Sequence, residues 1–230
     1  MAGERLERIL VELSAGVGAS SSARLCEVST TMIGVSGAGI MLMSGDVPQG
    51  SVCTTDEVSA LIEDLQYTLG EGPCVDAYHQ DRVVLEPDLA DPRSPRWPAF
   101  TPQAVGAGVR ALFGFPMRVG SVRLGAMNLY QDRPGPLSDD QHADALVMAD
   151  VAARWVLDIQ ADAPPGALAE QLEAGADFHF IVQNAAGIVS VQLGVSLTEA
   201  LIRLRAYAFS NDRLLDAVAR DVVAHTLRLD

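Results

Sequence analysis

The sequence predicts an α+β protein in which a central antiparallel sheet flanked by helices is followed by an all-α unit of three helices. Short apolar runs bounded by turn residues recur through the first part of the chain, which is typical of strands. Two longer runs joined by residues 119–121 predict an antiparallel hairpin. After the Pro-Pro-Gly segment at 164–166, only helical periodicity remains. A chain of 230 residues is long enough for two small domains.

The first part is expected to begin and end with helices. Four apolar residues at helical spacing predict an amphipathic N-terminal helix: Leu6, Ile9, Leu10 and Leu13. A second helix is expected over residues 21–33. A last helix is expected to begin near Ser138, where Asp139 and Asp140 favour a helix N-terminus, and to reach Ile159. The strands expected between these helices are residues 38–43, 51–54, 82–85, 108–117 and 122–130.

A segment rich in proline and glycine marks the domain boundary. The Pro-Pro-Gly segment ends one helical pattern before another begins at Ala167. We therefore place a first domain at residues 1–160, a linker at 161–167 and a second domain at 168–230.

Two helices of the second domain are expected from their caps and apolar stripes. Ser196, with Glu199 three residues later, forms a capping box that opens a helix from Leu197 to about Phe209. Asn211 is expected to cap a further helix that continues to about residue 227. The apolar face of the first helix consists of Leu197, Ala200, Leu201, Leu204 and Ala208. That of the second consists of Leu215, Val218, Ala219, Val222 and Leu229.

Arginine and aromatic side chains lie outside these apolar stripes. One flank of the first helix pairs Arg203 with Tyr207, and the other pairs Arg205 with Phe209. Guanidinium groups bind phosphate in a bidentate manner, and aromatic rings stack on unpaired bases, so the pattern favours looped RNA over duplex DNA. The predicted RNA contacts are Arg203, Arg205, Tyr207, Arg213, Arg220 and Arg228. Alternatively, the arginines only solvate a helical bundle and the two aromatic residues complete its core.

Four spaced motifs of the second domain carry a family resemblance. They are Ala185-Ala-Gly-Ile-Val189, Gly194-Val-Ser-Leu-Thr-Glu-Ala-Leu201, Leu204-Arg-Ala-Tyr-Ala208 and Asp216-Ala-Val-Ala-Arg-Asp-Val-Val223. Over roughly residues 168–228 the chain resembles an ANTAR domain. The resemblance implies a three-helix module of transcription antiterminators, which binds paired stem-loops in nascent RNA and prevents a terminator hairpin from forming. Gly175 departs from the pattern, because it lies where the family has a long helix and glycine costs about 1 kcal/mol relative to alanine.

The first domain has motifs of its own, namely Leu69-Gly-Glu-Gly-Pro-Cys74, Pro92-Arg-Ser-Pro-Arg-Trp-Pro98 and a closing hairpin that ends in Asn128-Leu-Tyr130. Over about residues 5–160 this pattern resembles a GAF domain. Together with the second domain, the chain looks like the GAF-ANTAR regulators of actinobacteria. The resemblance implies a sensor pocket between the sheet and the helices and loops that cover one face. Because GAF domains bind cyclic nucleotides, haem, tetrapyrroles or nothing, the cofactor stays unknown.

Six residues of the first domain are candidates for lining that pocket. Ligand cavities are mostly apolar, and the candidates are Cys74, Trp97, Phe100, Phe113, Phe115 and Met127. Pro73 suits the first turn of a helix, and a helix N-terminus stabilises a thiolate, so Cys74 is a candidate redox sensor. His79 is the candidate axial ligand if the domain holds haem. Ordinary core packing is the alternative for the pocket candidates, and an exposed position at a helix end is the alternative for His79.

Charge and cysteine content restrict the class of protein. The net charge is −14, but residues 198–228 hold five arginines against four acidic residues. An RNA site there would therefore act through the geometry of its contacts rather than through bulk charge.

No apolar run is long enough to span a membrane and no secretory pattern is visible, so we expect a cytoplasmic protein with no membrane partner. Three scattered cysteines predict neither a disulfide framework nor a metal site.

These observations favour a signal-responsive, RNA-binding transcription antiterminator that is not an enzyme and acts as a homodimer, with two tails for two adjacent RNA hairpins. Two alternatives remain. One is a thiol enzyme resembling free methionine-R-sulfoxide reductases, with Cys53 and Cys74 as its thiols. The other is a tail that only dimerises or docks a partner, in which the helix at residues 138–159 extends the contact. The tail residues available for that pairing are Leu168, Leu172, Ile181, Val182, Ala185, Ile188 and Val189.

Overall fold

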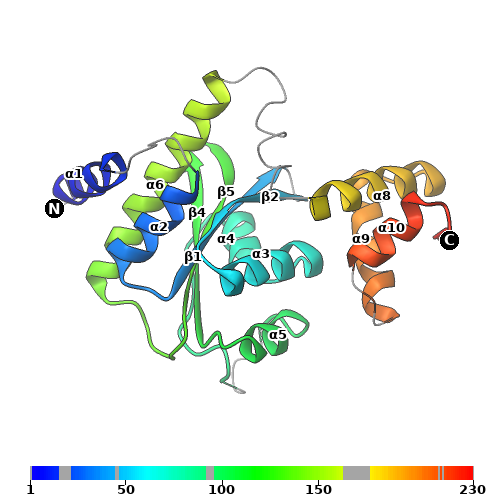
Figure 1. Ribbon diagram of the computed structural model, residues 1–230, viewed down its shortest axis with the longest axis horizontal. Helices are drawn as coiled ribbons and strands as arrows, with labels where there is room; N and C mark the ends of the chain where they lie inside the picture. The colour runs from blue at the N-terminus through cyan, green and yellow to red at the C-terminus, as the bar shows by residue number, and fades with distance from the viewer. Residues whose placement is uncertain are drawn as a thin grey trace. The chain divides into compact units, whose positions relative to one another are not determined.

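The chain forms two compact units, residues 1–165 and residues 166–230 (Figure 1). The computed structural model describes residues 2–15, 22–44, 47–91, 96–162, 177–211, 213 and 215–229. The break between the units lies inside the expected linker at 161–167. Residues 163–167 of that linker lie outside the described residues, as do Leu168, Leu172 and Gly175.

A five-stranded antiparallel sheet forms the centre of the first unit (Figure 1), with the strand order β2-β1-β5-β4-β3. The strands are β1 (Gly37–Ser44), β2 (Val47–Thr54), β3 (Val84–Glu86), β4 (Ala111–Val119) and β5 (Val122–Gln131). The predicted hairpin is confirmed: β4 and β5 pair around a turn in which Gly120 has a φ of 60°, a left-handed conformation that suits glycine. Strand β2 begins four residues earlier than expected.

Helices cover both faces of the sheet. One face carries α2 (Ser22–Ile33) and α6 (Asp139–Asp162), against which α1 (Ala2–Ser14) packs; the other carries α3 (Glu57–Leu69), α4 (Pro73–Gln80) and α5 (Phe100–Gly106). Successive side chains of a strand point to opposite faces. In β4, Phe115 accordingly contacts His142 of α6, while its neighbour Gly114 lies against Pro73 of α4.

Helix α3 is absent from the sequence-based expectations, although its ends carry clear signals. Asp56 caps its first turn, accepting a hydrogen bond from the Ser59 backbone N–H at 2.7 Å, and Ser59 Oγ accepts one from the Asp56 backbone N–H at 2.9 Å. Gly70 ends the helix in the left-handed conformation, with a φ of 65°. Pro73 then opens α4 at its first position, as the sequence predicts.

The prediction of no disulfide is wrong. Cys26 of α2 and Cys53 of β2 form one, and their Cα atoms lie 6.0 Å apart although 27 residues separate them in sequence. An odd number of cysteines leaves one unpaired, and among the described residues the free thiol is that of Cys74. The expected cytoplasmic location stays a prediction.

The second unit contains α8 (Asp177–Leu193), α9 (Leu197–Ser210) and α10 (Leu215–Val223), each packed on the other two. The Ser196 cap is confirmed, because its side chain accepts a hydrogen bond from the Glu199 backbone N–H at 3.1 Å. The predicted apolar stripes of α9 and α10 are buried except at Leu197, which is 44% exposed at the start of its helix. The ANTAR-like motifs therefore lie on packed helices.

The prediction for the start and length of α10 is wrong. Asn211 caps the end of α9 instead, since its side-chain amide donates to the Tyr207 carbonyl at 2.9 Å. Helix α10 begins at Leu215 and ends at Val223, and His225 then turns the chain with a φ of 55°.

Among the described helices, none alone has the length and apolar character needed to cross a membrane. One pair, residues 181–193 and 197–210, meets these criteria jointly, across a bend of 105°.

Candidate functional site

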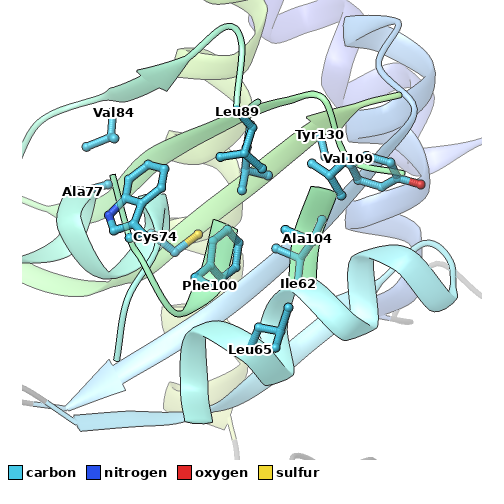
Figure 2. Packing of buried hydrophobic residues seen from close by; sticks show 13 residues of the cluster. Ile62, Leu65, Cys74, Ala77, Val84, Leu89, Phe100, Ala104, Val109 and Tyr130 are labelled. Carbon is cyan, nitrogen blue, oxygen red and sulfur yellow. The ribbon is translucent and has the colours of Figure 1, made fainter. Parts of the chain in front are cut away.

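Side chains from α3, α4, α5 and the sheet form a buried cluster on one face of the sheet (Figure 2). It contains three of the six predicted pocket residues, Cys74, Trp97 and Phe100, and each is at most 7% exposed. Figure 2 shows Cys74 and Phe100 beside one another within this cluster. These three residues therefore lie on the face that α3, α4 and α5 cover, packed among other apolar side chains.

The other three predicted pocket residues lie on the opposite face. Phe115 contacts the His142 ring at a centroid distance of 5.5 Å, and Ser29 Oγ of α2 lies 3.6 Å from the Met127 sulfur. Phe113 shares their face because it is two residues from Phe115 in the same strand. A single pocket lined by all six is thus ruled out, because the sheet itself separates the two groups.

The two sequence motifs of the first unit are joined by acidic side chains. The Glu71 carboxylate accepts hydrogen bonds from the backbone N–H groups of Ala99 and Phe100, at 2.9 and 3.2 Å, where α5 begins. The Asp76 carboxylate accepts from Trp97 Nε1 at 3.1 Å and from Arg96 at 3.0 Å. These contacts fix the segment before α5 against α4, so the spacing of the two motifs has a structural role.

A group of buried polar side chains lies between α3, α4 and β5, on the face that holds Cys74. Asn128 of β5 donates to the Glu63 carboxyl of α3, and Gln66 accepts from the Cys74 backbone N–H at 2.7 Å. Each of these side chains is at most 1% exposed. Buried polar atoms are normally hydrogen-bonded. In the described part of the chain, three atoms here have no such partner: Glu63 Oε2, Gln66 Nε2 and Asn128 Oδ1. No local pattern in the sequence indicates this group, because Glu63 and Gln66 of α3 meet Asn128 of β5 only in the folded chain.

Burial determines the ionisation of this group. It raises the pKa of Glu63 well above its ordinary value, so that the carboxyl tends to keep its proton, and nearby Asp64 adds to the effect. It also raises the pKa of the Cys74 thiol, with a further contribution from Glu63. Burial therefore works against the thiolate that the position of Cys74 at the start of α4 led us to expect.

His79 lies exposed at the end of α4, and its ring contacts Tyr78 edge-on at a centroid distance of 5.7 Å. Within the described parts of the chain, no group of three or more histidine, cysteine, aspartate or glutamate side chains could hold a metal ion. His79 therefore lies at an exposed helix end, which is the alternative to its predicted role as a haem ligand.

The predicted RNA contacts differ in their exposure. Those exposed are Arg203, Arg220 and Arg228, and those half-buried are Arg205, Tyr207 and Arg213. Arg203 pairs with Glu199 at 2.8 Å on the surface of α9. Arg213 pairs with Asp221 at 2.6 Å and donates to the Ala217 carbonyl, so it holds its segment to α10. Arg213 would have to exchange Asp221 for a phosphate in order to bind RNA.

The aromatic residues of α9 also differ from one another. Tyr207 is half-buried, but Phe209 is 70% exposed, and Ile202 of the same helix is 56% exposed. Residues seven apart lie on one side of a helix, so Ile202 and Phe209 flank Arg205 on the outer surface. Completion of the core therefore does not account for Phe209.

Comparison with known proteins agrees with this arrangement. Residues 22–154 match the GAF domain family. The chain belongs to this family. Comparison with curated proteins gives no match. The fold resembles the GAF domain of a phosphoenolpyruvate-protein phosphotransferase from Acinetobacter, with 13% identity and a TM-score of 0.51 over 70% of this chain and 96% of that one. It also resembles free methionine-R-sulfoxide reductase from Neisseria meningitidis, with 13% identity and a TM-score of 0.50 over 70% and 92% of the two chains.

A GAF domain is a signal-sensing fold, and its cysteines here are poorly placed for thiol chemistry. Cys53 lies in the disulfide with Cys26, and Cys74 is 1% exposed with a raised pKa. A thiol enzyme needs an accessible thiolate. Neither Cys53 nor Cys74 therefore presents an accessible thiolate in this structure.

We expect Glu63→Gln to change how the stability of the GAF domain depends on pH. The pKa of Glu63 is higher in the folded protein than in the unfolded chain. The stabilisation that the protonated carboxyl provides is therefore complete at pH values below the unfolded pKa, and it is lost as the pH rises toward the folded pKa. Glutamine keeps the oxygen that Asn128 contacts but cannot ionise. Above about pH 4.5, the variant should therefore gain stability over wild type by up to about 1.4 kcal/mol per pH unit.

Urea unfolding from pH 4.5 to 8 measures this difference. Glu57→Gln is the matched control, because Glu57 is exposed on the same helix. If both variants follow the wild-type pH profile, Glu63 does not keep a raised pKa in the folded protein.

Proposed function

We propose that this protein is a signal-responsive, RNA-binding transcription antiterminator. The GAF domain receives a signal, and the C-terminal helical unit binds paired stem-loops in nascent RNA. The ANTAR resemblance of residues 168–228 supplies the class of target.

One observation supports RNA binding most strongly: the exposed Phe209 on the outer surface of α9, one turn after Arg205. A side chain that is 70% exposed gains little from burial, and an exposed aromatic ring suits stacking. Unpaired bases in an RNA loop offer free faces to such a ring, whereas bases in a duplex are already stacked. The geometry therefore favours a looped single strand.

The distribution of charge supports selective rather than general binding. Residues 1–163 hold 22 acidic residues and 11 arginines, while residues 198–228 hold four acidic residues and five arginines. An acidic sensor repels polyanions at long range, so affinity depends on contacts at close range. Arg203, Arg220 and Arg228 are the exposed cations that would make them.

The signal is proposed to act on the face of the sheet that α3, α4 and α5 cover. Cys74, Trp97 and Phe100 lie there beside the polar group of Glu63, Gln66 and Asn128. Polar anchors in an apolar setting fix the orientation of a small ligand. Because the two activities are linked in one chain, RNA should alter the affinity for such a ligand by the same factor as the ligand alters affinity for RNA.

We expect Arg220→Ala to weaken RNA binding and its dependence on salt. Loss of one phosphate contact should lower the slope of log affinity against log salt by about 0.7 to 0.9. The measurement is a salt titration of the full chain with a fluorescent RNA that carries two adjacent hexaloop hairpins. An RNA with scrambled loops and a DNA duplex serve as the comparison ligands.

The control variant is Arg133→Ala, which removes the same charge from an exposed site in the GAF domain. It should leave the slope unchanged. Equal slopes for wild type and Arg220→Ala would remove Arg220 from the interface. No preference for the intact loops at low salt would instead favour a tail that docks a protein partner.

A further inference from the structure

A short strap, residues 96–99, leads into α5 and has a strained backbone. Its Trp97 has a φ of 53°, a left-handed conformation that a bulky side chain rarely adopts. Pro98 follows, and a residue before proline normally has an extended conformation. The strained conformation costs free energy, and it persists because the contacts of the strap offset that cost. Release of the strap would let Trp97 return to an extended conformation.

Arg96 binds the strap to its surroundings. It pairs with Asp76 of α4 at 3.0 Å and lies 3.7 Å from Glu86 of β3. Its guanidinium group also lies 4.3 Å from the centre of the Trp97 ring, within the range of a cation–π contact. Trp97 Nε1 donates to the same Asp76 at 3.1 Å. A single side chain thus joins the strap to both α4 and β3.

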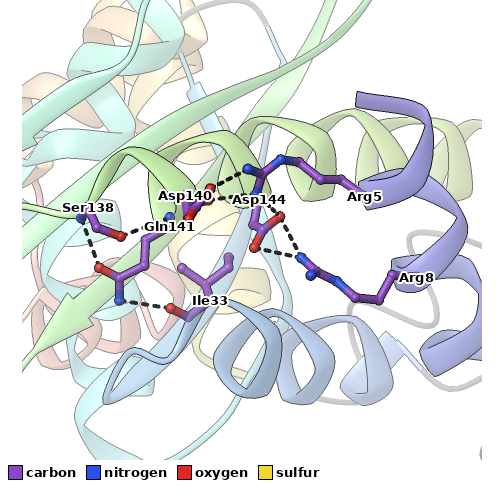
Figure 3. A network of polar contacts seen from close by, with 7 residues as sticks. All are labelled: Arg5, Arg8, Ile33, Ser138, Asp140, Gln141 and Asp144. Carbon is purple, nitrogen blue, oxygen red and sulfur yellow. Dashed lines mark hydrogen bonds and ion pairs between the residues drawn. The ribbon is translucent and has the colours of Figure 1, made fainter. Parts of the chain in front are cut away.

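These contacts are accessible to water. The side chains of Arg96 and Asp76 are 33% and 29% exposed, so water and salt compete for the ion pair. The ion pairs on the opposite face of the sheet are better shielded (Figure 3). There Arg5 and Arg8 of α1 both bind Asp144 of α6, whose side chain is only 8% exposed. Of the two covers, the strap is therefore the one whose ion pair water reaches more readily.

Movement of the strap would uncover Cys74. Trp97 packs on Phe100 with ring centres 6.1 Å apart, and Phe100 lies beside Cys74 in the buried cluster (Figure 2). Phe100 begins α5, and its backbone N–H donates to the Glu71 carboxylate at 3.2 Å. Because Phe100 follows the strap directly, it moves when the strap moves, and Cys74 then loses its cover on that side.

The same movement gives access to buried polar atoms that are not hydrogen-bonded. In the described part of the chain, Glu63, Gln66 and Asn128 each have one such atom. Gln66 contacts the Cys74 backbone directly, so a path that uncovers Cys74 also leads toward this polar group. An unpaired buried polar atom costs free energy, which water or a polar ligand recovers on reaching it. The polar group therefore favours an open state that solvent or a ligand can enter.

We propose that residues 96–106, the strap together with α5, form a gate that opens as a unit and admits the signal to the face of the sheet that α3, α4 and α5 cover. The contacts of Arg96 keep the gate closed, and the strain at Trp97 favours its opening. The role of the gate rests on the proposed function, whereas its opening is a property of the GAF domain alone and requires neither ligand nor RNA.

Modification of Cys74 by iodoacetamide in the full-length protein measures the opening. Cys26 and Cys53 are joined in the disulfide, which leaves the Cys74 thiol to react. A local opening exposes little surface, so modification through the gate depends weakly on urea, whereas modification through global unfolding depends steeply on urea. Wild type should show the weak dependence at low urea. Arg96→Ala should react about tenfold faster with the same weak dependence, because it loses an ion pair and a cation–π contact.

Arg82→Ala is the matched control, because it removes the same charge from the exposed segment that follows α4, and it should react at the wild-type rate. Asp76→Asn keeps an oxygen for Trp97 Nε1 but removes the charge that Arg96 binds, so it should also speed the reaction. The gate is refuted if modification of wild type and of Arg96→Ala follows global unfolding at every urea concentration. It is equally refuted if a local opening exists but Arg96→Ala reacts no faster than wild type. Neither result involves RNA, so failure of the gate and failure of RNA binding are observed separately.

Discussion

Reduction of the disulfide between Cys26 and Cys53 is expected to lower the free energy of unfolding by about 3 kcal/mol. The disulfide closes a loop across 27 residues and restricts the unfolded chain more than the folded one. It also ties α2 to β2, an edge strand that pairs only with β1. Urea unfolding of the protein with and without a reducing agent measures the difference, with thiol counting to verify that reduction is complete.

The double variant Cys26→Ala with Cys53→Ala separates this effect from any action of the reductant on Cys74. It retains the free thiol but should unfold at the same urea concentration in both conditions. The prediction is wrong if fully reduced wild-type protein unfolds at the same midpoint as oxidised protein.

The disulfide also illustrates a limit of prediction from sequence. Cysteine spacing excludes close-set motifs, but it carries no information on which distant residues a fold brings together. Cys26 and Cys53 meet because α2 packs against the sheet beside β2, and only the arrangement of elements reveals this. The sheet separates the predicted pocket residues for the same reason, since sequence identified them as large and apolar without assigning their face.

Local signals, in contrast, were sufficient for several elements, although Asn211, interpreted as the cap of α10, ends α9 instead. The hairpin of β4 and β5, the Ser196 cap and the buried stripes of α9 and α10 follow from turn residues, caps and periodicity. Helix α3 carries such signals in Asp56, Ser59 and Gly70, so a search for caps finds it. The polar group of Glu63, Gln66 and Asn128 has no local signal, because α3 and β5 meet only in the folded chain.

Gly114→Ala is expected to destabilise the GAF domain by about 3 kcal/mol, the upper end of the usual cost of overpacking, because the neighbour is rigid. A Cβ atom at this position would lie 2.3 Å from the Pro73 carbonyl oxygen and 3.1 Å from the Cys74 backbone nitrogen. Both are backbone atoms at the start of α4, so no side-chain rotation relieves the overlap. Helix α4 must move away from β4, which disturbs the hydrogen bond from Cys74 to Gln66 and opens the cluster around the thiol.

Two measurements follow this displacement, urea unfolding and the rate at which a thiol reagent modifies Cys74 under native conditions. Gly106→Ala is the matched control, because no atom lies within 4 Å of the added Cβ, and alanine there should be neutral or stabilise by up to about 1 kcal/mol. A Gly114→Ala protein as stable as Gly106→Ala would mean that α4 is not held tightly on the sheet. The face of the sheet that α3, α4 and α5 cover would then open at little cost, and Cys74 would react readily in the wild-type protein as well.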